Sequence, residues 1–251
     1  MQYHPFFTSF RGVRGCFNTA FFYTGFLLLS LWAGGVSLAE PPPADIRVGV
    51  LEGPCANAII AVLEEQGQGL TVIALPKIVI DTLAKSDVVI VPQVSGATPL
   101  ELLKQASGIL NIWVENGGGV LFLHDNVGFG QHPAIFPAIG IGTNNPVLDK
   151  VVVAKDHPVT KGLAVNQVFS PAFTYDHIAI KPGPDGEVVI KNERNDAVLV
   201  VGKVGQGKVA LNGMYPGRGG LNKNDCAGGE KAPTGEELRV LLNTVRWLGE
   251  K

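Results

Sequence analysis

Short apolar runs alternate with amphipathic stretches along the first half of the chain beyond residue 45. The runs at 46–51, 70–75, 87–92 and 120–123 are almost continuously apolar, which is typical of strands buried on both faces of a sheet. Residues 56–66 and 100–116 carry apolar positions at helical spacing, and 80–84 is a short helix candidate. This alternation predicts parallel strands in the order 2-1-3-4, with 56–66 and 100–116 on opposite faces.

The pattern changes after residue 126. Residues 127–147 are rich in Gly, Pro and Asn, and predict a long loop with a short helix near 134–139. Further strands are predicted at 151–154, 173–180, 187–190, 198–204 and 208–211, with a hairpin turn at 205–207. Leucines and valines at helical spacing predict a last helix over 236–248. The second half therefore adds β-strands to an α/β sheet.

The N-terminal segment has the three parts of a secretory signal. Arg11 and Arg14 are the only Lys, Arg, Asp or Glu residues before Glu40, and an apolar run over 20–32 leads to Ser37-Leu38-Ala39. The run is shorter than the roughly 20 residues that span a bilayer. We therefore expect cleavage after Ala39 and a periplasmic or secreted product. The alternatives are an uncleaved signal anchor over 17–39 and a start codon assigned too far upstream. Residues 40–45 form a proline-rich leader, and 46–251 form one domain.

Composition excludes several classes of protein. Lys+Arg total 20 and Asp+Glu total 22, so the formal net charge is −2, which argues against a dedicated nucleic-acid binder. An apolar fraction of 46% excludes a disordered chain. Three cysteines are too few for a disulfide scaffold or a four-thiolate zinc site. In an exported product, Cys55 and Cys226 follow strands that end at the same sheet edge, and we expect them to form a disulfide.

Four segments together resemble the class I glutamine amidotransferase-like fold and, within it, the ThuA-like (trehalose-utilisation) group. They are Trp113-Val114-Glu115-Asn116-Gly117-Gly118-Gly119 with the run to His124, Asp156-His157-Pro158-Val159-Thr160-Lys161-Gly162-Leu163, Gly205-Gln206-Gly207-Lys208-Val209, and the helix Leu238 to Leu248. The resemblance covers about residues 46–249. It implies a flavodoxin-like, doubly wound, mostly parallel sheet with additional C-terminal β-strands, in which ligands bind at the carboxyl ends of the strands.

The residues that the resemblance would place in a catalytic triad are absent. Amidotransferases of this fold carry a Cys nucleophile on a sharp turn after a strand, and a His and a Glu in a His-Pro-Glu run. Here that turn offers His124, Asp125 and Asn126, and Tyr215-Pro216-Gly217 stands where His-Pro-Glu is expected. A thiolate nucleophile needs a sulfur beside a base. The sequence therefore predicts that glutamine hydrolysis is absent.

Polar side chains follow several of the predicted strands. His124 and Asp125, at the turn after the fourth strand, are the candidates for the centre of a pocket and for acid–base chemistry. The remaining candidates for ligand binding are Glu52, Gln93 and Asn126, with His132, His157 and Tyr215 at the rim of the pocket. Structural roles stay open for the histidines, because His157 can cap a turn and His177 can be a satisfied strand residue.

These features predict an exported ThuA-like domain that binds a small polar ligand, and we expect that ligand to be a carbohydrate. The alternatives are a non-catalytic interaction module and a metal-dependent hydrolase that uses the His and Asp side chains. The histidine spacing is not that of a short zinc motif, and the glycine-rich pieces at 128–130 and 140–142 are not a dinucleotide fingerprint. We therefore assign no metal and no cofactor, and expect membrane contact only through an uncleaved anchor.

Overall fold

A computed structural model describes residues 45–53, 55–94, 97–147, 149–174, 177–218 and 230–251. The expected signal segment, the proline-rich leader up to residue 44, and Cys226 lie outside the described residues. Within the described part of the chain, no helix is long and apolar enough to cross a lipid bilayer.

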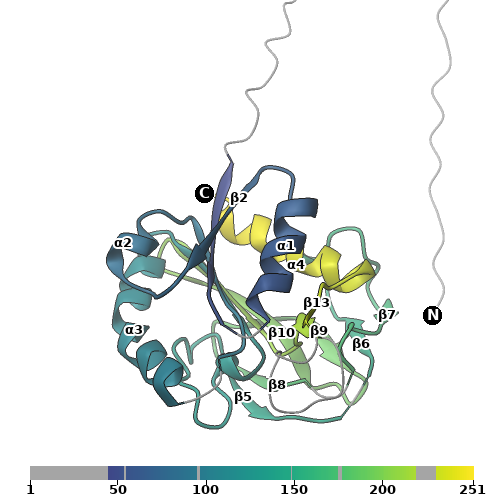
Figure 1. Ribbon diagram of the computed structural model, residues 1–251. Helices are drawn as coiled ribbons and strands as arrows, with labels where there is room; N and C mark the ends of the chain where they lie inside the picture. The colour runs from purple at the N-terminus through teal and green to yellow at the C-terminus, as the bar shows by residue number, and fades with distance from the viewer. Residues whose placement is uncertain (1–44, 54, 95–96, 148, 175–176, 219–229) are drawn as a thin grey trace, which may run out of the picture. The chain divides into compact units, whose positions relative to one another are not determined.

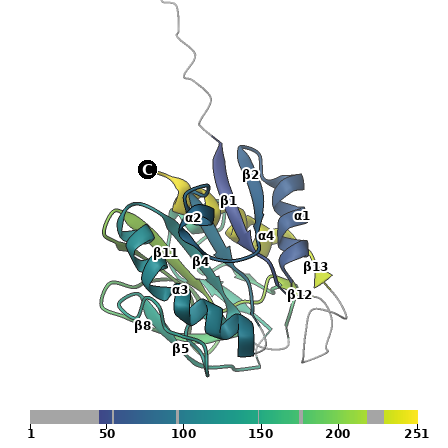
Figure 2. The ribbon, with the colours of Figure 1, turned by 60° about the vertical axis from the view of Figure 1, so that its left-hand side comes forward.

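One half of the sheet is parallel, with the strand order β2-β1-β3-β4-β11 (Figures 1 and 2). The strands are β1 (Ile46–Leu51), β2 (Leu70–Leu75), β3 (Val88–Val91), β4 (Gly119–Leu123) and β11 (Gly207–Asn212). Each neighbouring pair in this order is parallel. The predicted order 2-1-3-4 is therefore confirmed, and β11 continues the parallel half beside β4.

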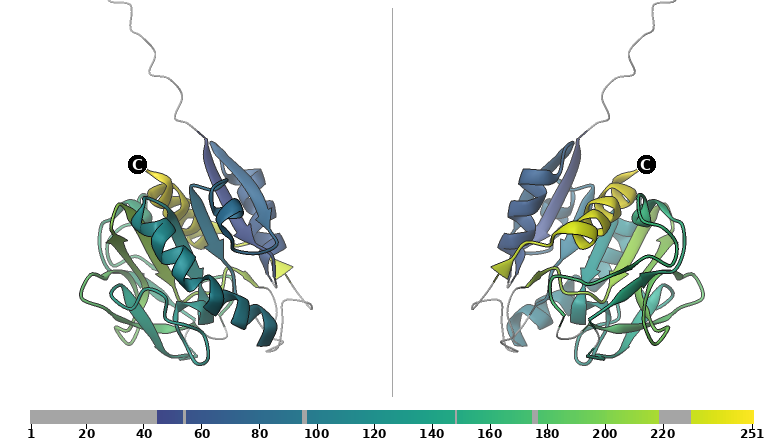
Figure 3. Two further views of the ribbon diagram at one scale, coloured as in Figure 1. Left: turned by 90° about the vertical axis from the view of Figure 1, so that its left-hand side faces the viewer. Right: turned by 90° about the vertical axis from the view of Figure 1, so that its right-hand side faces the viewer.

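Helices cover both faces of the parallel half (Figure 3). Along β3, Val88 and Ile90 face one core cluster and Val89 and Val91 face the other, because successive strand residues point to opposite sides. The first cluster contains apolar residues of α1 (Ala56–Gln66) and α4 (Gly235–Gly249). The second contains those of α2 (Ile80–Leu83) and α3 (Ala97–Glu115). The expectation that 56–66 and 100–116 lie on opposite faces is confirmed.

The other half of the sheet is antiparallel. A tight turn at Gly205–Gln206 joins β11 to β10 (Ala197–Val204), and the path continues through β9 (Glu187–Asn192), β6 (Val151–Val153) and β7 (Val168–Phe169). A branch from β10 runs through β8 (Ala179–Pro182) to β5 (Gly140–Asn144). In the described residues this makes an 11-stranded mixed sheet, with a separate ribbon of β12 (Gly217–Arg218) and β13 (Glu230–Lys231).

Three predictions of local structure were wrong. Residues 134–139 form turns in place of a helix, and Gly140–Asn144, expected as loop, is β5. The strand expected over 173–180 begins only at Ala179. These segments depend on pairing with each other, because β5 and β8 are antiparallel neighbours at the edge of the sheet. Short edge strands carry little periodicity of their own, so the pattern of the sequence does not reveal them.

Two glycines give a matched test of the packing. A Cβ on Gly213, just after β11, would lie 1.9 Å from the Ile178 carbonyl oxygen, whereas a Cβ on Gly108, on the exposed side of α3, would meet no atom within 4 Å. We expect Gly213→Ala to lower the free energy of unfolding by about 2–3 kcal/mol. Gly108→Ala should raise it by about 0.5–1 kcal/mol, because alanine loses less backbone entropy in a helix. Urea denaturation measures both, and equal effects would contradict this packing.

Candidate functional site

A polar cluster forms where β3 and β4 end. The chain turns sharply after β4 into the 3₁₀-helix η1 (His124–Val127), and His124 adopts a left-handed backbone with φ 51°. This region of φ is uncommon for residues other than glycine, and such residues gather at functional sites. The turn places Asp125 and Asn126 beside Gln93, which follows β3.

Gln93 holds the Asp125 carboxylate through a reciprocal pair of hydrogen bonds. The Asp125 backbone N–H donates to Gln93 Oε1 at 3.0 Å, and Gln93 Nε2 donates to Asp125 Oδ2 at 2.6 Å. Gln93 is buried, at 8% exposed. The carboxylate is therefore held by a group that has little freedom to move.

Asn126 fixes the protonation of His132. The Asn126 side-chain Nδ2 donates to the Pro92 carbonyl, so its Oδ1 can only accept. That oxygen lies 2.8 Å from His132 Nδ1, which must then carry the proton. In the neutral ring Nε2 is consequently a bare acceptor, and it lies 3.8 Å from Asp125 Oδ2.

Electrostatics keep both groups in their acceptor forms near neutral pH. Burial lowers the pKa of His132 and outweighs the opposing charge of Asp125, so the imidazole is neutral. Burial alone would raise the pKa of Asp125. The adjoining His124 and the hydrogen bond from Gln93 outweigh burial and hold that pKa below its usual range. Two acceptors thus lie close together with no proton between them.

Asp125 and His132 open into a pocket of about 420 Å³. Gln93 lines it with them, and Phe129 adds an apolar ring. The remaining lining residues are Val94, Ala97, Leu100, Gly130 and Gln131. A few polar groups beside apolar side chains are typical of sites for small polar molecules.

His124 is in contact with Asp125 but does not line this pocket. Its side chain is buried, at 5% exposed, with Nδ1 3.2 Å from Asp125 Oδ1. Its ring stacks on Tyr215 at a centroid distance of 4.2 Å. Phe173 meets Tyr215 edge-on, and the Arg218 guanidinium lies over both rings. The expectation that His124 is at the centre of the pocket and Tyr215 at its rim was therefore wrong: neither lines the pocket, and the stacked His124 ring contacts Asp125.

Two other predicted residues lie away from the pocket. Glu52 lines a separate, mostly apolar pocket of about 340 Å³ between α3 and residues 76–79. His157 accepts a hydrogen bond from the Val159 N–H, and its ring meets Trp247 edge-on. Trp247 is in the last turn of α4, so His157 does not lie at the rim of the Asp125 pocket. His177 is buried with Nε2 3.1 Å from Asn192 Nδ2.

Among the described residues, no three His, Cys, Asp or Glu side chains lie close enough together to hold a metal ion. His124, Asp125 and His132 come nearest to such a group. His124 Nδ1 lies 3.2 Å from Asp125 Oδ1, and His132 Nδ1 lies 2.8 Å from Asn126 Oδ1, so one nitrogen of each histidine is already in contact with a neighbouring side chain.

Cys55 is disulfide-bonded and buried at the start of α1. Its expected partner, Cys226, lies outside the described residues, so the pairing remains a prediction. Peptide mapping of the purified protein without reductant should recover one cross-linked peptide pair that joins Cys55 to Cys226. A cross-link between Cys55 and Cys16, or a Cys226 thiol that alkylates freely, would contradict it.

Glu237 is a buried acid that the sequence analysis missed. It is 2% exposed, Oε2 accepts from the Ala172 N–H at 2.9 Å, and Oε1 has no hydrogen-bond partner among the described residues. Burial raises its pKa to about 7, against the hydrogen bond from Ala172 and the charge of Lys231. The signal in the sequence is misleading, because Thr234 and Glu237 have the spacing of a helix capping box. Thr234 makes no side-chain capping bond, and Glu237 points inward.

Known structures share this fold at low sequence identity. A ThuA-like protein from Bacteroides uniformis is 17% identical with a TM-score of 0.61, and the match covers 85% of this chain and 95% of that one. A cytoplasmic protein, STM3548, from Salmonella typhimurium is 16% identical with a TM-score of 0.56, over 81% and 98% of the two chains. A β-galactosidase from Bacillus circulans sp. alkalophilus matches at 14% identity and a TM-score of 0.54, over 80% of this chain but 31% of its own.

No protein-family model matches the sequence, and no curated protein matches it. The matches to solved structures show that the chain has the flavodoxin-like α/β fold of ThuA-like proteins, as the resemblance implied.

Proposed function

We propose that this protein is an exported ThuA-like domain that binds a carbohydrate in the pocket of Asp125 and His132, without amidotransferase chemistry. The observation that carries the proposal is the pair of acceptors 3.8 Å apart, Asp125 Oδ2 and His132 Nε2, at the wall of one pocket. Two acceptors cannot bond to each other without a proton. A ligand that donates hydrogen bonds from neighbouring positions satisfies both.

Carbohydrates meet this requirement because their ring hydroxyls are adjacent donors. The Phe129 ring lines the same pocket and suits the apolar C–H face of a sugar. The pocket of about 420 Å³ is in the size range of small-molecule sites. The β-galactosidase that shares the fold is a carbohydrate-active enzyme by name, which supports the same ligand class.

The residues at the turn argue against amidotransferase chemistry. His124 has the strained backbone of the turn, yet it is an imidazole stacked on Tyr215 where a thiolate would be needed. The disulfide at Cys55 supports export, since disulfides persist in oxidising compartments.

Calorimetric titration with galactose, glucose and trehalose tests the proposal. We expect saturable binding of at least one of these sugars, with amide chemical-shift changes centred on Gly130 and Gln131. The per-O-methylated form of that sugar keeps the ring but donates no hydrogen bond, so it should not bind. Absence of binding by all three sugars, or equal binding of the methylated form, would overturn the proposal.

A further inference from the structure

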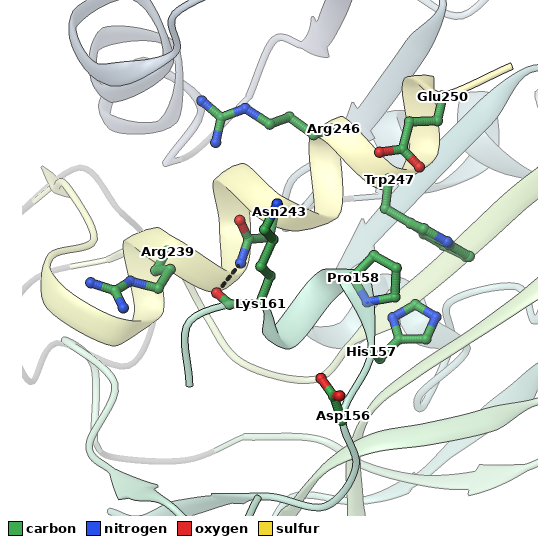
Figure 4. Close-up of a pocket in the computed structure, with 9 residues that line it drawn as sticks. All are labelled: Asp156, His157, Pro158, Lys161, Arg239, Asn243, Arg246, Trp247 and Glu250. Carbon is green, nitrogen blue, oxygen red and sulfur yellow. Dashed lines mark hydrogen bonds between the residues drawn. The ribbon is translucent and has the colours of Figure 1, made fainter. Parts of the chain in front are cut away.

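A second pocket lies at the opposite edge of the sheet, between the 3₁₀-helix η2 (Pro158–Thr160) and α4 (Figure 4). Its volume is about 920 Å³. A Cβ on Gly119, the first residue of β4, would lie 2.6 Å from Leu248 O, so the last turn of α4 touches the start of β4. Asp125 follows the other end of that strand. The last turn of α4, which lines this second pocket, and Asp125 therefore lie at opposite ends of β4.

Hydrogen bonds between α4 and the turn after η2 hold this second pocket in shape. Arg239 Nη1 donates to Gly162 O at 2.7 Å. Asn243 Nδ2 donates to Val159 O at 3.3 Å. It also donates to Lys161 O at 2.9 Å, which is the dashed line in Figure 4. The pocket is thus largely formed before any ligand enters, which lowers the entropy lost on binding.

Three cations line the pocket without a carboxylate partner. Lys161, Arg239 and Arg246 all contribute to the lining, and none has an Asp or Glu oxygen within salt-bridge distance among the described residues. His157 adds a fourth donor: its Nδ1 accepts from the Val159 N–H, so in the neutral ring Nε2 carries the proton. This pocket is rich in donors, whereas the Asp125 pocket is rich in acceptors.

Two features of the pocket disfavour the binding of an anion: it is lined by two carboxylates, and it lies beside the carboxyl end of α4. The structure reduces the effect of each. Asp156 and Glu250 also line it, but in Figure 4 Asp156 lies at the bottom and Glu250 at the upper right, while the guanidinium groups of Arg239 and Arg246 lie at the left and upper left. The carboxyl end of a helix carries partial negative charge. Lys208 Nζ offsets it by donating to the carbonyls of Trp247 and Glu250 at 2.7 and 2.8 Å.

We propose that this pocket between η2 and α4 binds the phosphate group of a small ligand through Lys161, Arg239 and Arg246. Guanidinium groups match phosphate oxygens in pairs, and unpaired cations around a preformed pocket are what such a group requires. The ligand is distinct from the neutral sugar of the Asp125 pocket, and this second site does not depend on that assignment.

Titration with inorganic phosphate at low ionic strength and pH 7 tests this inference. We expect saturable binding to the wild-type protein, and at least tenfold weaker binding to Arg246→Gln. The Arg246 side chain makes no hydrogen bond to the described residues, so this variant leaves the turn intact. Arg194→Gln, at an exposed arginine that does not line the pocket, is the matched control and should bind as the wild type does.

Glucose 6-phosphate and glucose distinguish a phosphate ester from free phosphate. Tighter binding of glucose 6-phosphate than of phosphate, lost in Arg246→Gln, identifies a sugar phosphate as the ligand class; equal binding identifies the phosphate group alone. Lack of saturable phosphate and glucose 6-phosphate binding, or binding that is unchanged in both Arg246→Gln and Arg239→Gln, would overturn the inference.

Discussion

Glu237→Gln is expected to stabilise the folded protein by about 3 kcal/mol at pH 8 and to have little effect at pH 5. The reason is the buried carboxyl, whose pKa is raised to about 7 from an ordinary value of 4.5. Burial penalises the charged form, and in the part of the chain that the structure describes one hydrogen bond, from the Ala172 N–H, reaches its two oxygens. Glutamine resembles the protonated acid in shape and carries no charge at any pH.

The direction of the pH effect follows from proton linkage. The folded state binds the Glu237 proton more tightly than the unfolded state, so this stabilisation is fully present below the unfolded pKa. It is lost as the pH rises through the folded pKa. Between pH 5 and pH 8 the wild type should therefore lose stability relative to the variant.

Urea unfolding across this pH range, followed by circular dichroism, measures the difference. Glu236→Gln is the control, because Glu236 is a neighbouring carboxylate that is only half-buried and contacts Gln167. That variant should leave the pH dependence of the wild type unchanged. Parallel stability curves for the wild type and Glu237→Gln would show that the buried acid is not the source of the effect.

Asp125→Asn is expected to weaken sugar binding roughly 10- to 150-fold, since a hydrogen bond to a charged group contributes about 1.5–3 kcal/mol. The asparagine amide offers a donor where the pocket now offers a charged acceptor. The backbone bond from residue 125 to Gln93 Oε1 remains, so the melting temperature should change by only a few degrees.

Asp81→Asn is the matched control for this experiment. Asp81 is exposed in the first turn of α2 and does not line the Asp125 pocket, so its variant should bind sugar with wild-type affinity. A loss of binding in Asp81→Asn, or wild-type affinity in Asp125→Asn, would contradict the assignment of the Asp125 carboxylate to sugar binding.

The parallel half of the fold could be predicted from the sequence because each element carries its own signal. The strands at 46–51 and 70–75 and the helix at 56–66 have the bounds that the apolar pattern predicted. These segments are covered on both faces, so their residues are apolar without interruption. Among the described residues, β5 pairs with β8, and β8 pairs in addition with one residue of β10. The sequences of β5 and β8 carry no pattern that predicts this pairing.

The candidate site was predicted only in part, because position along the chain does not determine where a side chain points. Asp125 and Gln93 were expected at the strand ends, and the structure joins them in one pair of hydrogen bonds. His124 was expected to face the ligand, but its left-handed backbone turns the ring onto Tyr215. His132 was expected only at the rim, and its orienting partner Asn126 became apparent only in three dimensions.

The second pocket could not be predicted from the sequence for a similar reason. His157 and Trp247 are 90 positions apart, and only the folding of α4 against η2 brings their rings to a centroid distance of 5.2 Å. The resemblance to ThuA-like proteins drew attention to both segments but assigned neither a role.

The protonation of His132 tests the central claim most directly, because the site was assigned from two acceptors that face one ligand. Long-range ¹H–¹⁵N correlation spectra of protein with ¹⁵N-labelled histidine report which ring nitrogen carries the proton. We expect the His132 proton on Nδ1 and a bare Nε2 at pH 7, with the Nε2 resonance shifting when a bound sugar donates to it. A proton on Nε2, or an Nε2 resonance that does not move when sugar saturates the protein, would contradict the account.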